Sequence, residues 1–290
     1  MAKKRIFTQT EIDQILDKFD NGQSMESLQK EFHTRKIRDI LTENNREIKQ
    51  GGKRINSGSK YKYTFNESYF EKIDSVEKAY WLGFIYADGY ITRKTSGQAH
   101  LCLCLSEEEP INKFKKAINT NKPTNSFDAK NSYNNTISKA FRITIISDKI
   151  VNDIEKLGVV ENKSLILTFP TWLETTYIPH FIRGYFDGDG SVFLTKNNYL
   201  YSEILGTESF LKELQKHLIF LDSNKISKDS RENVNCFRLR LSSEKLTLDL
   251  YKYLYKDCGE YSDNYLSRKK DKFEKYIKEK GSTTIITHPN

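Results

Sequence analysis

An internal repeat constrains the fold of this chain more than any other feature of its sequence. The apolar segment 79–87, followed by Asp88-Gly89, recurs as 179–188, followed by Asp189-Gly190. The later strand 141–145 (FRITI) likewise recurs as 237–241 (FRLRL). Each copy reads helix, polar hairpin, helix, two strands and a final amphipathic helix. Duplication of a unit of about a hundred residues predicts an α+β fold with two αββαββα half-domains, 66–170 and 171–280, related by a pseudo-twofold axis.

Residues 1–50 precede the repeat and predict three short helices. Thr8 and Glu11 form a capping-box pair before the first helix, and Ser24 and Thr34 are the expected N-caps of the other two. The third helix has apolar residues on one face, and its other face carries Arg35, Lys36 and Arg38. Three short helices ending in a basic one resemble a small all-α helix-turn-helix domain that binds DNA. A plain three-helix bundle with a solvated face is the alternative.

The segment 51–65 is predicted to be a flexible basic linker. It is rich in glycine and serine, and the cations Lys53 and Arg54 face no acidic residue within it. Such a composition suits contact with a phosphate backbone. Residues 281–290 are predicted to form a tail without an assigned role.

The composition favours a polyanionic partner in a reducing compartment. The formal net charge is +8, and the four cysteines lack the paired spacing of zinc sites. Cys102 and Cys104 alternate with leucines, which is typical of small buried thiols on one face of a strand. No apolar run is long enough to span a bilayer, and no signal-peptide pattern is present. We therefore expect a soluble intracellular protein, in a bacterial or phage-infected cytoplasm or in an organelle, without a membrane partner.

Small residues recur at helical spacing in both copies of the apolar segment. Gly83 and Ala87 are four residues apart, as are Gly184 and Gly188. Each pair lies on one helix face and allows another backbone to approach closely. The pattern predicts that the two helices pack against each other through these residues.

Each of these helices ends in an aspartate followed by glycine. Glycine is a common helix stop because it can adopt a left-handed conformation, whereas a carboxylate is unfavourable at the negative end of the helix dipole. If the helices pack in parallel, Asp88 and Asp189 also repel each other. A single Asp-Gly after an apolar run indicates only a turn, but two copies at matching points of a repeat indicate function. Mg²⁺ would neutralise such a pair, and carboxylates that share metal ions can support phosphodiester hydrolysis.

Both segments resemble the LAGLIDADG motif of the homing endonuclease family, and the resemblance covers residues 66–280. It departs from the motif at Tyr86 and at Gly188. The matching residues are Gly83, Ala87, Asp88 and Gly89, and Gly184, Asp187, Asp189 and Gly190. The resemblance implies that the motif helices form the interface between the half-domains and that saddle-shaped antiparallel sheets straddle the duplex. It also implies that the last aspartates hold two or more Mg²⁺ ions over the minor groove, and that each half cuts one strand, leaving short 3′ overhangs.

The resemblance implies further site residues. Gly89 and Gly190 are expected beside the metal ions. Lys163 and Lys269 are the expected catalytic lysines, and solvated surface lysines are the alternative. Arg268 and Lys270 are neighbouring candidates for the second lysine, and Glu107 and Thr207 are candidates for orienting water.

Polar residues that alternate with apolar neighbours on the strands, or that lie in the hairpin turns, are expected to contact DNA. Arginine can read guanine bidentately and lysine mostly anchors phosphate, although a merely solvated sheet face would show the same pattern. These candidates are Arg93, Lys94, Arg142, Lys196, Arg238 and Arg240.

The sequence therefore predicts a monomeric, site-specific, Mg²⁺-dependent endonuclease acting on double-stranded DNA. Two alternatives stay open: a DNA-binding regulator that does not cleave, and a maturase that binds intron RNA. The retention of both aspartates favours the endonuclease, because a protein that does not cleave has no use for an opposed acidic pair.

Overall fold

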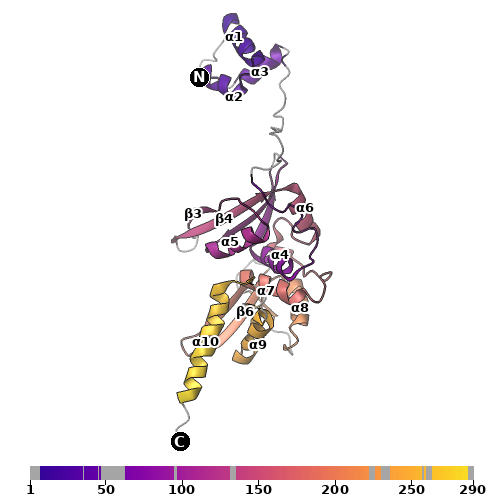
Figure 1. The fold of residues 1–290 in the computed structure, drawn as a ribbon, viewed down its shortest axis with the longest axis vertical. Helices are drawn as coiled ribbons and strands as arrows, with labels where there is room; N and C mark the ends of the chain where they lie inside the picture. Colours follow the sequence, from indigo (N-terminus) through magenta and orange to yellow (C-terminus); the bar gives the residue numbers. More distant parts are fainter. Residues whose placement is uncertain are drawn as a thin grey trace. The chain divides into compact units, whose positions relative to one another are not determined.

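The computed structural model describes residues 7–34, 36–44, 46, 63–94, 97–130, 135–221, 226–229, 236–256, 258 and 263–286 (Figure 1). The expected DNA contacts Arg35, Lys53 and Arg54 lie outside these ranges. The chain divides into two compact units, Met1–Lys62 and Tyr63–Asn290. None of the described helices is both long enough and apolar enough to cross a membrane.

The first unit contains the three predicted helices, α1 (Gln9–Asp20), α2 (Met25–Glu31) and α3 (Ile37–Glu43). The Thr8 capping box and the Ser24 N-cap are confirmed. The predicted Thr34 N-cap is wrong. α3 begins at Ile37 with Lys36 at the N-cap, and the Thr34 hydroxyl instead accepts a hydrogen bond from the Lys36 amide. The helices share a small core of Ile15, Leu28, Ile37, Ile40 and Leu41.

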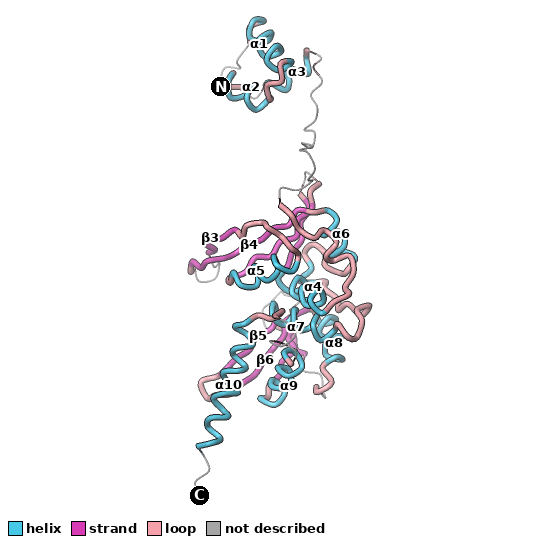
Figure 2. Tube along the Cα trace, in the orientation of Figure 1, coloured by secondary structure: helices cyan, strands magenta, loops and turns pink. Residues whose placement is uncertain are grey.

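The second unit contains the duplicated fold, and the αββαββα order is confirmed in both halves (Figure 2). The first half comprises α4 (Val76–Asp88), β1 (Gly89–Arg93), β2 (Ala99–Leu105), α5 (Glu108–Ala117), β3 (Asn125–Lys130), β4 (Ile137–Ile146) and α6 (Asp148–Lys156). The second comprises α7 (Ile178–Asp189), β5 (Gly190–Leu194), β6 (Leu200–Gly206), α8 (Glu208–His217), β7 (Ile226–Lys228), β8 (Phe237–Leu241) and α9 (Glu244–Tyr255). The sheets are antiparallel with the matching orders β1-β2-β4-β3 and β5-β6-β8-β7.

The two halves differ in the segments that come after the repeated unit. The first half continues into a short 3₁₀ turn, η1 (Lys163–Leu165), whereas the second continues into the long helix α10 (Ser267–Ile286). α10 packs on α9 through Phe273, whose ring contacts Tyr251 and Tyr255. The sequence did not predict α10, and the helix extends into the segment expected to be a tail.

Each sheet packs one face on helices, α5 and α6 in the first half and α8 and α9 in the second. Apolar residues alternate onto that face, for example Leu101, Leu103, Ile143 and Ile145, all of which are buried. We call the opposite face of each sheet its open face. The first open face carries Tyr90, Thr92, His100, Cys102, Cys104, Arg142 and Thr144. The second carries Ser191, Phe193, Tyr201, Glu203, Leu205, Arg238 and Arg240.

Candidate active site

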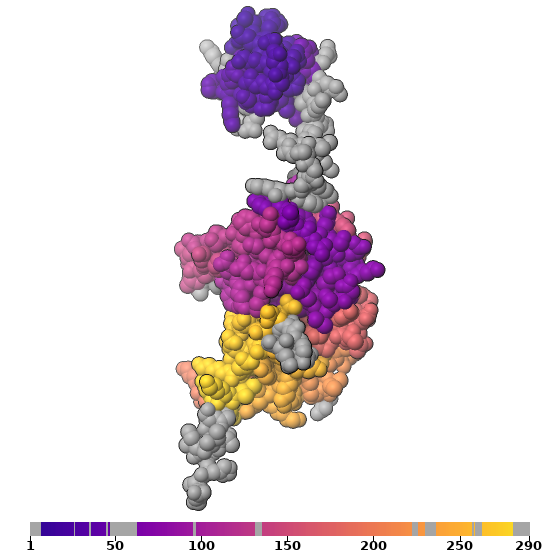
Figure 3. All heavy atoms as spheres, in the orientation of Figure 1, coloured from indigo at the N-terminus to yellow at the C-terminus, as the bar shows by residue number. Residues whose placement is uncertain are grey.

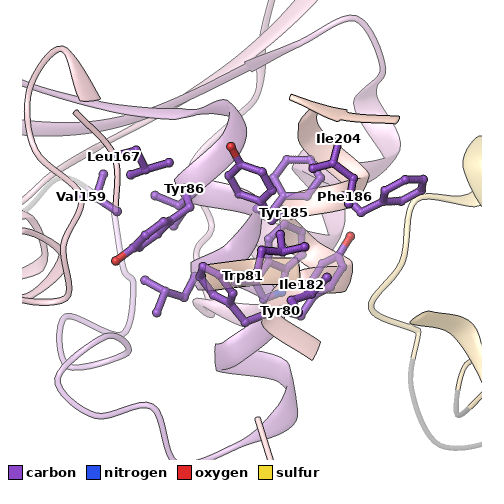
Figure 4. Packing of buried hydrophobic residues seen from close by; sticks show 14 of the residues in the cluster. Tyr80, Trp81, Tyr86, Val159, Leu167, Ile182, Tyr185, Phe186 and Ile204 are labelled. Carbon is purple, nitrogen blue, oxygen red and sulfur yellow. The ribbon is translucent and has the colours of Figure 1, made fainter. Parts of the chain in front are cut away.

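The helices α4 and α7 pack against each other through glycine, as predicted. A Cβ on Gly83 would lie 2.0 Å from the Phe181 carbonyl oxygen, and a Cβ on Gly184 would lie 1.9 Å from that of Tyr80. Only glycine fits at either position, because the neighbouring atoms belong to the backbone. Large side chains surround this contact, with Tyr86 toward Val159 and Leu167 and with Tyr80 close to Ile182 (Figure 4).

The two helices run in parallel and end together. A Cβ on Gly188 would lie 2.2 Å from the Ala87 Cβ and 3.2 Å from Asp88 Oδ2. Asp189 is the next residue of α7, so the packing brings the two carboxylates to one place. Gly83, Gly184, Gly188 and Ala87 thus all lie where the two helices touch.

The terminal glycines do not adopt the left-handed conformation that is common at helix stops. Gly89 has φ −76° and ψ 150°, and Gly190 has φ −84° and ψ 157°, so both are extended and begin a strand. Glycine is required at both positions because a larger residue would collide with the preceding turn of the helix. A Cβ on Gly89 would lie 2.7 Å from Ile85 Cγ2, and a Cβ on Gly190 would lie 2.2 Å from Phe186 Cδ2. The helix thus turns directly into the strand, with the aspartate at the junction.

Burial makes both carboxylates reluctant to ionise. It raises the pKa of Asp88, although the ammonium groups of Lys269 and Lys163 act in the opposite direction. Burial and the neighbouring Asp88 carboxylate together raise the pKa of Asp189 to about 6. The ammonium groups of Lys163 and Lys269 act in the opposite direction and partly offset this shift. Two nearby carboxylates with raised pKa values form a site that a cation would stabilise.

Lys163 and Lys269 lie at the ends of the motif helices rather than on the solvated surface. Lys163 is 8% exposed, and its Nζ donates to the Ala87 carbonyl at 2.9 Å. Lys269 is 3% exposed and donates to the carbonyls of Phe186, Gly188 and Gly190 at 2.7, 3.1 and 2.5 Å. These ammonium groups therefore bind backbone carbonyls at the helix ends, including those of Ala87 and Gly188 in the last turns of α4 and α7.

The environment of the two lysines also changes their acidity. Burial lowers the pKa of Lys163, and it lowers the pKa of Lys269 to about 8. The carboxylates of Asp88 and Asp189 act in the opposite direction on both lysines. The structure thus brings the four candidate catalytic side chains into electrostatic contact.

The neighbouring candidates have other partners. Arg268 forms an ion pair with Glu107, and Lys270 forms one of 2.7 Å with Glu274. Thr207 is buried at the N-cap of α8, where it accepts from the Phe210 amide and donates to the Leu167 carbonyl at 2.6 Å. Thr207 is therefore a helix cap, which corrects its expected role in orienting water. Glu107 lies in a pocket with Asp88, Cys104, Asp187 and Arg268.

Asp187 organises the second half of the site, and the sequence did not reveal this role. The side chain is 1% exposed and accepts hydrogen bonds from Tyr80 Oη at 3.0 Å, Tyr255 Oη at 2.7 Å and the Leu266 amide at 2.7 Å. These three donors come from α4, from α9 and from the segment before α10. The motif match marked Asp187, but only the fold shows what it holds.

The start of α10 also contacts the first half. Lys113 Nζ donates to the Tyr265 carbonyl at 2.9 Å, and Ser267 Oγ donates to Glu109 Oε1 at 2.5 Å. Figure 3 shows the resulting seam, where atoms of the C-terminal segment in yellow abut the magenta atoms of the first half. The segment that carries Lys269 is therefore held by contacts with both halves.

The expected DNA contacts are not all on the open faces. Arg142, Arg238 and Arg240 are, and Lys94 and Lys196 are exposed beside the hairpin turns. Arg93 was expected to face the DNA, but it does not lie on the open face. It shares the opposite face with Gly89 and Ile91, and it forms an ion pair of 2.6 Å with Glu155 of α6. In the first unit, Arg38 is exposed and Lys36 is half-buried.

The described residues include no group of three or more His, Cys, Asp or Glu side chains placed to hold a metal ion. A cation at this site would therefore rely on the two aspartates together with ligands that the protein side chains do not provide. The carbonyl of Gly190, one of the predicted metal neighbours, already accepts from Lys269, which leaves it one lone pair.

No protein-family model and no curated protein sequence matches this chain. Among solved structures, the homing endonuclease I-WcaI bound to its DNA recognition sequence has 13% identity and a TM-score of 0.47, covering 71% of this chain and 91% of that chain. The meganuclease I-SmaMI bound to uncleaveable DNA has 14% identity and a TM-score of 0.46, covering 69% and 88%. Full-length DUF199/WhiA from Thermatoga maritima has 18% identity and a TM-score of 0.43, covering 75% and 67%. The structural neighbours thus include LAGLIDADG homing endonucleases, the family that the two motifs of this chain resemble.

Proposed function

We propose that the protein is a site-specific endonuclease that hydrolyses both strands of duplex DNA with Asp88 and Asp189. The observation that carries this proposal is the pairing of two half-buried carboxylates at the ends of parallel helices, one from each half. A structural role does not account for the pair, because burial and mutual repulsion both disfavour its ionised form.

The donor set fits Mg²⁺. This ion takes few carboxylates and completes its coordination with water and phosphate oxygens, so the neighbouring carboxylates of Asp88 and Asp189 would suffice as its protein ligands. Bound there, Mg²⁺ would supply an activated water and stabilise the leaving oxygen of the phosphodiester. Asp88 and Asp189 would hold the ions, and Gly89 and Gly190 would let the strand backbone pass close to them.

Lys163 and Lys269 would position the carboxylates and stabilise negative charge on the scissile phosphates. Their ammonium groups are fixed by helix-end carbonyls, so little reorganisation is needed when charge develops. The open sheet faces would bind the duplex on either side of the aspartates. The N-terminal unit would add affinity as a helix-turn-helix domain, through Arg38 and Lys36 of the described residues.

The full chain can be tested with a library of random duplex DNA and Mg²⁺. The proposal predicts cleavage at a defined set of related sites, with short 3′ overhangs, and loss of cleavage when a chelator replaces the metal. Retention of specific duplexes without any cleavage would contradict the proposal and favour the non-cleaving regulator. Preferential retention of structured RNA over duplex DNA would favour the maturase.

A further inference from the structure

Four charged side chains form a cluster on and beside the second open face. Arg238 and Arg240 lie on β8, Glu203 lies on the adjacent β6, and Asp229 directly follows β7. Arg240 donates through Nε and Nη2 to Glu203 Oε2, at 3.3 and 3.2 Å. Glu203 is 9% exposed, so its carboxylate is a fixed acceptor rather than a mobile surface group.

Arg238 lies between both acids of this cluster. Its Nη2 donates to Asp229 Oδ2 at 2.9 Å, and its Nη1 is 3.7 Å from Glu203 Oε2. The Arg238 side chain is 28% exposed, compared with 45% for Arg240. Arg238 is thus held within the cluster, and Arg240 presents the more accessible guanidinium.

Aromatic rings support Arg240 from a second direction. Its guanidinium carbon is 5.2 Å from the centroid of the Tyr201 ring, which stacks on Phe193 at 4.7 Å and 13°. Glu203 occupies the Nε side of the guanidinium, and this leaves the donors of Nη1 available. A planar donor group fixed by a carboxylate and a ring loses little freedom on binding, which suits bidentate recognition.

The charges of the cluster balance. Two arginines face two carboxylates, so the cluster has little net attraction for phosphate, whose recognition depends on uncompensated cations. Arg142 differs, although it lies at the position of the first sheet that corresponds to Arg238. It packs 4.5 Å from the Phe127 ring centroid, and within the described part of the chain no carboxylate is among the groups that shift its pKa. On the first sheet, the charge of Arg142 is thus not compensated by a carboxylate of the described residues. On the second sheet, Arg240 is oriented by a carboxylate that also neutralises its charge.

We propose that Arg240 reads a guanine in the major groove of the half-site bound by the second half-domain, and that Glu203 is the positioning residue for this contact. The inference rests on the proposed DNA-binding function and assigns the base-reading role to one face. Guanine offers O6 and N7 to a guanidinium, the pairing that an arginine with a free edge forms most readily. Arg142 would instead anchor phosphate.

The test is a binding selection from random duplex DNA without divalent cations, so that no strand is cut. It compares the full-length wild type with Glu203→Gln, which keeps the shape of the side chain and removes its charge. We expect the variant to lose preference for guanine at one position by about fivefold or more. We also expect its salt dependence to steepen by up to about 0.9 in log–log slope, because the released Arg240 can bind phosphate.

Arg240→Lys is the second variant, since it keeps the charge and removes the planar fork. It should lose the same guanine preference while its salt dependence stays that of the wild type. Glu155→Gln is the matched control, because it breaks the Arg93 ion pair away from the open face and should leave every preference unchanged. Wild-type preferences in both Glu203→Gln and Arg240→Lys would overturn this inference alone. Failure of the wild type to bind any duplex would overturn it together with the proposed function.

Discussion

The Tyr80 hydroxyl of the first half donates a 3.0 Å hydrogen bond to the buried Asp187 carboxylate of the second half. Because Asp187 also accepts from the Leu266 amide, which immediately precedes α10, this bond links the interface to the segment that carries Lys269. Asp187 thus joins the two halves and helps to position Lys269, a candidate catalytic residue.

Removing the Tyr80 hydroxyl should therefore cost stability. Tyr80→Phe keeps the ring and deletes one donor to a buried charged acceptor, which we expect to lower the free energy of unfolding by about 1.5–3 kcal/mol. Urea denaturation measures this directly. Tyr199→Phe, at an exposed tyrosine of the second half, is the control and should change stability by less than about 0.5 kcal/mol. Equal effects of the two substitutions would contradict the role of this bond.

The raised pKa of Asp189 predicts that ionisation of this residue destabilises the metal-free protein as the pH rises. The pKa of Asp189 in the folded protein, about 6, lies above its value of about 3.9 in the unfolded chain. The contribution of Asp189 to the free energy of unfolding is therefore fully present below about pH 4 and is lost as the pH rises through 6. Asp189→Asn should match the wild type near pH 4 and exceed its unfolding free energy by on the order of 2 kcal/mol at pH 7. Chemical denaturation in a chelator tests this, with the exposed Asp128→Asn as the control. A pH-independent difference would show that the carboxylate is not responsible.

Lys163 should matter for cleavage more than for binding. Lys163→Met removes a fixed ammonium beside both aspartates, and we expect single-turnover cleavage to fall by about 10²-fold. The affinity for the same duplex should stay within about threefold, because one buried cation contributes little to the phosphate contacts. Lys212→Met, at an exposed lysine paired with Glu208 on α8, is the control. Parallel losses of affinity and cleavage would indicate a DNA anchor instead.

The N-terminal unit should contribute affinity through phosphate contacts. Replacing both Lys36 and Arg38 with glutamine should weaken binding and lower the log–log salt slope by up to about 2, since each phosphate contact contributes about 0.9. The measurement is a binding titration over a series of salt concentrations. An unchanged slope would make this three-helix unit a structural appendage.

The sequence predicted the features that depend on local periodicity. The small residues of the motif helices, their four-residue spacing and the repeat together indicated the helix pair, and the structure has that pair at backbone contact. Thr8 and Ser24 were recognisable as caps because a cap depends on residues only three positions away.

The features that depend on distant partners were not predictable in this way. Asp187 contacts Tyr80, Tyr255 and Leu266, which are far away in the sequence, so no spacing reveals the network. Arg93 lies two residues after the buried Ile91, so alternation places both on the helix-covered face, where the partner of Arg93 is Glu155 of the distant helix α6.

The central claim is that Asp88 and Asp189 form one centre that cuts both strands. The most direct test uses a duplex whose two strands are both end-labelled. This duplex is incubated in the presence of Mg²⁺ with the wild type, with Asp88→Asn or with Asp189→Asn. Binding of the same duplex is measured in parallel. The account predicts that each single substitution abolishes the double-strand break while affinity for the duplex survives. Undiminished double-strand cleavage by either variant would contradict it.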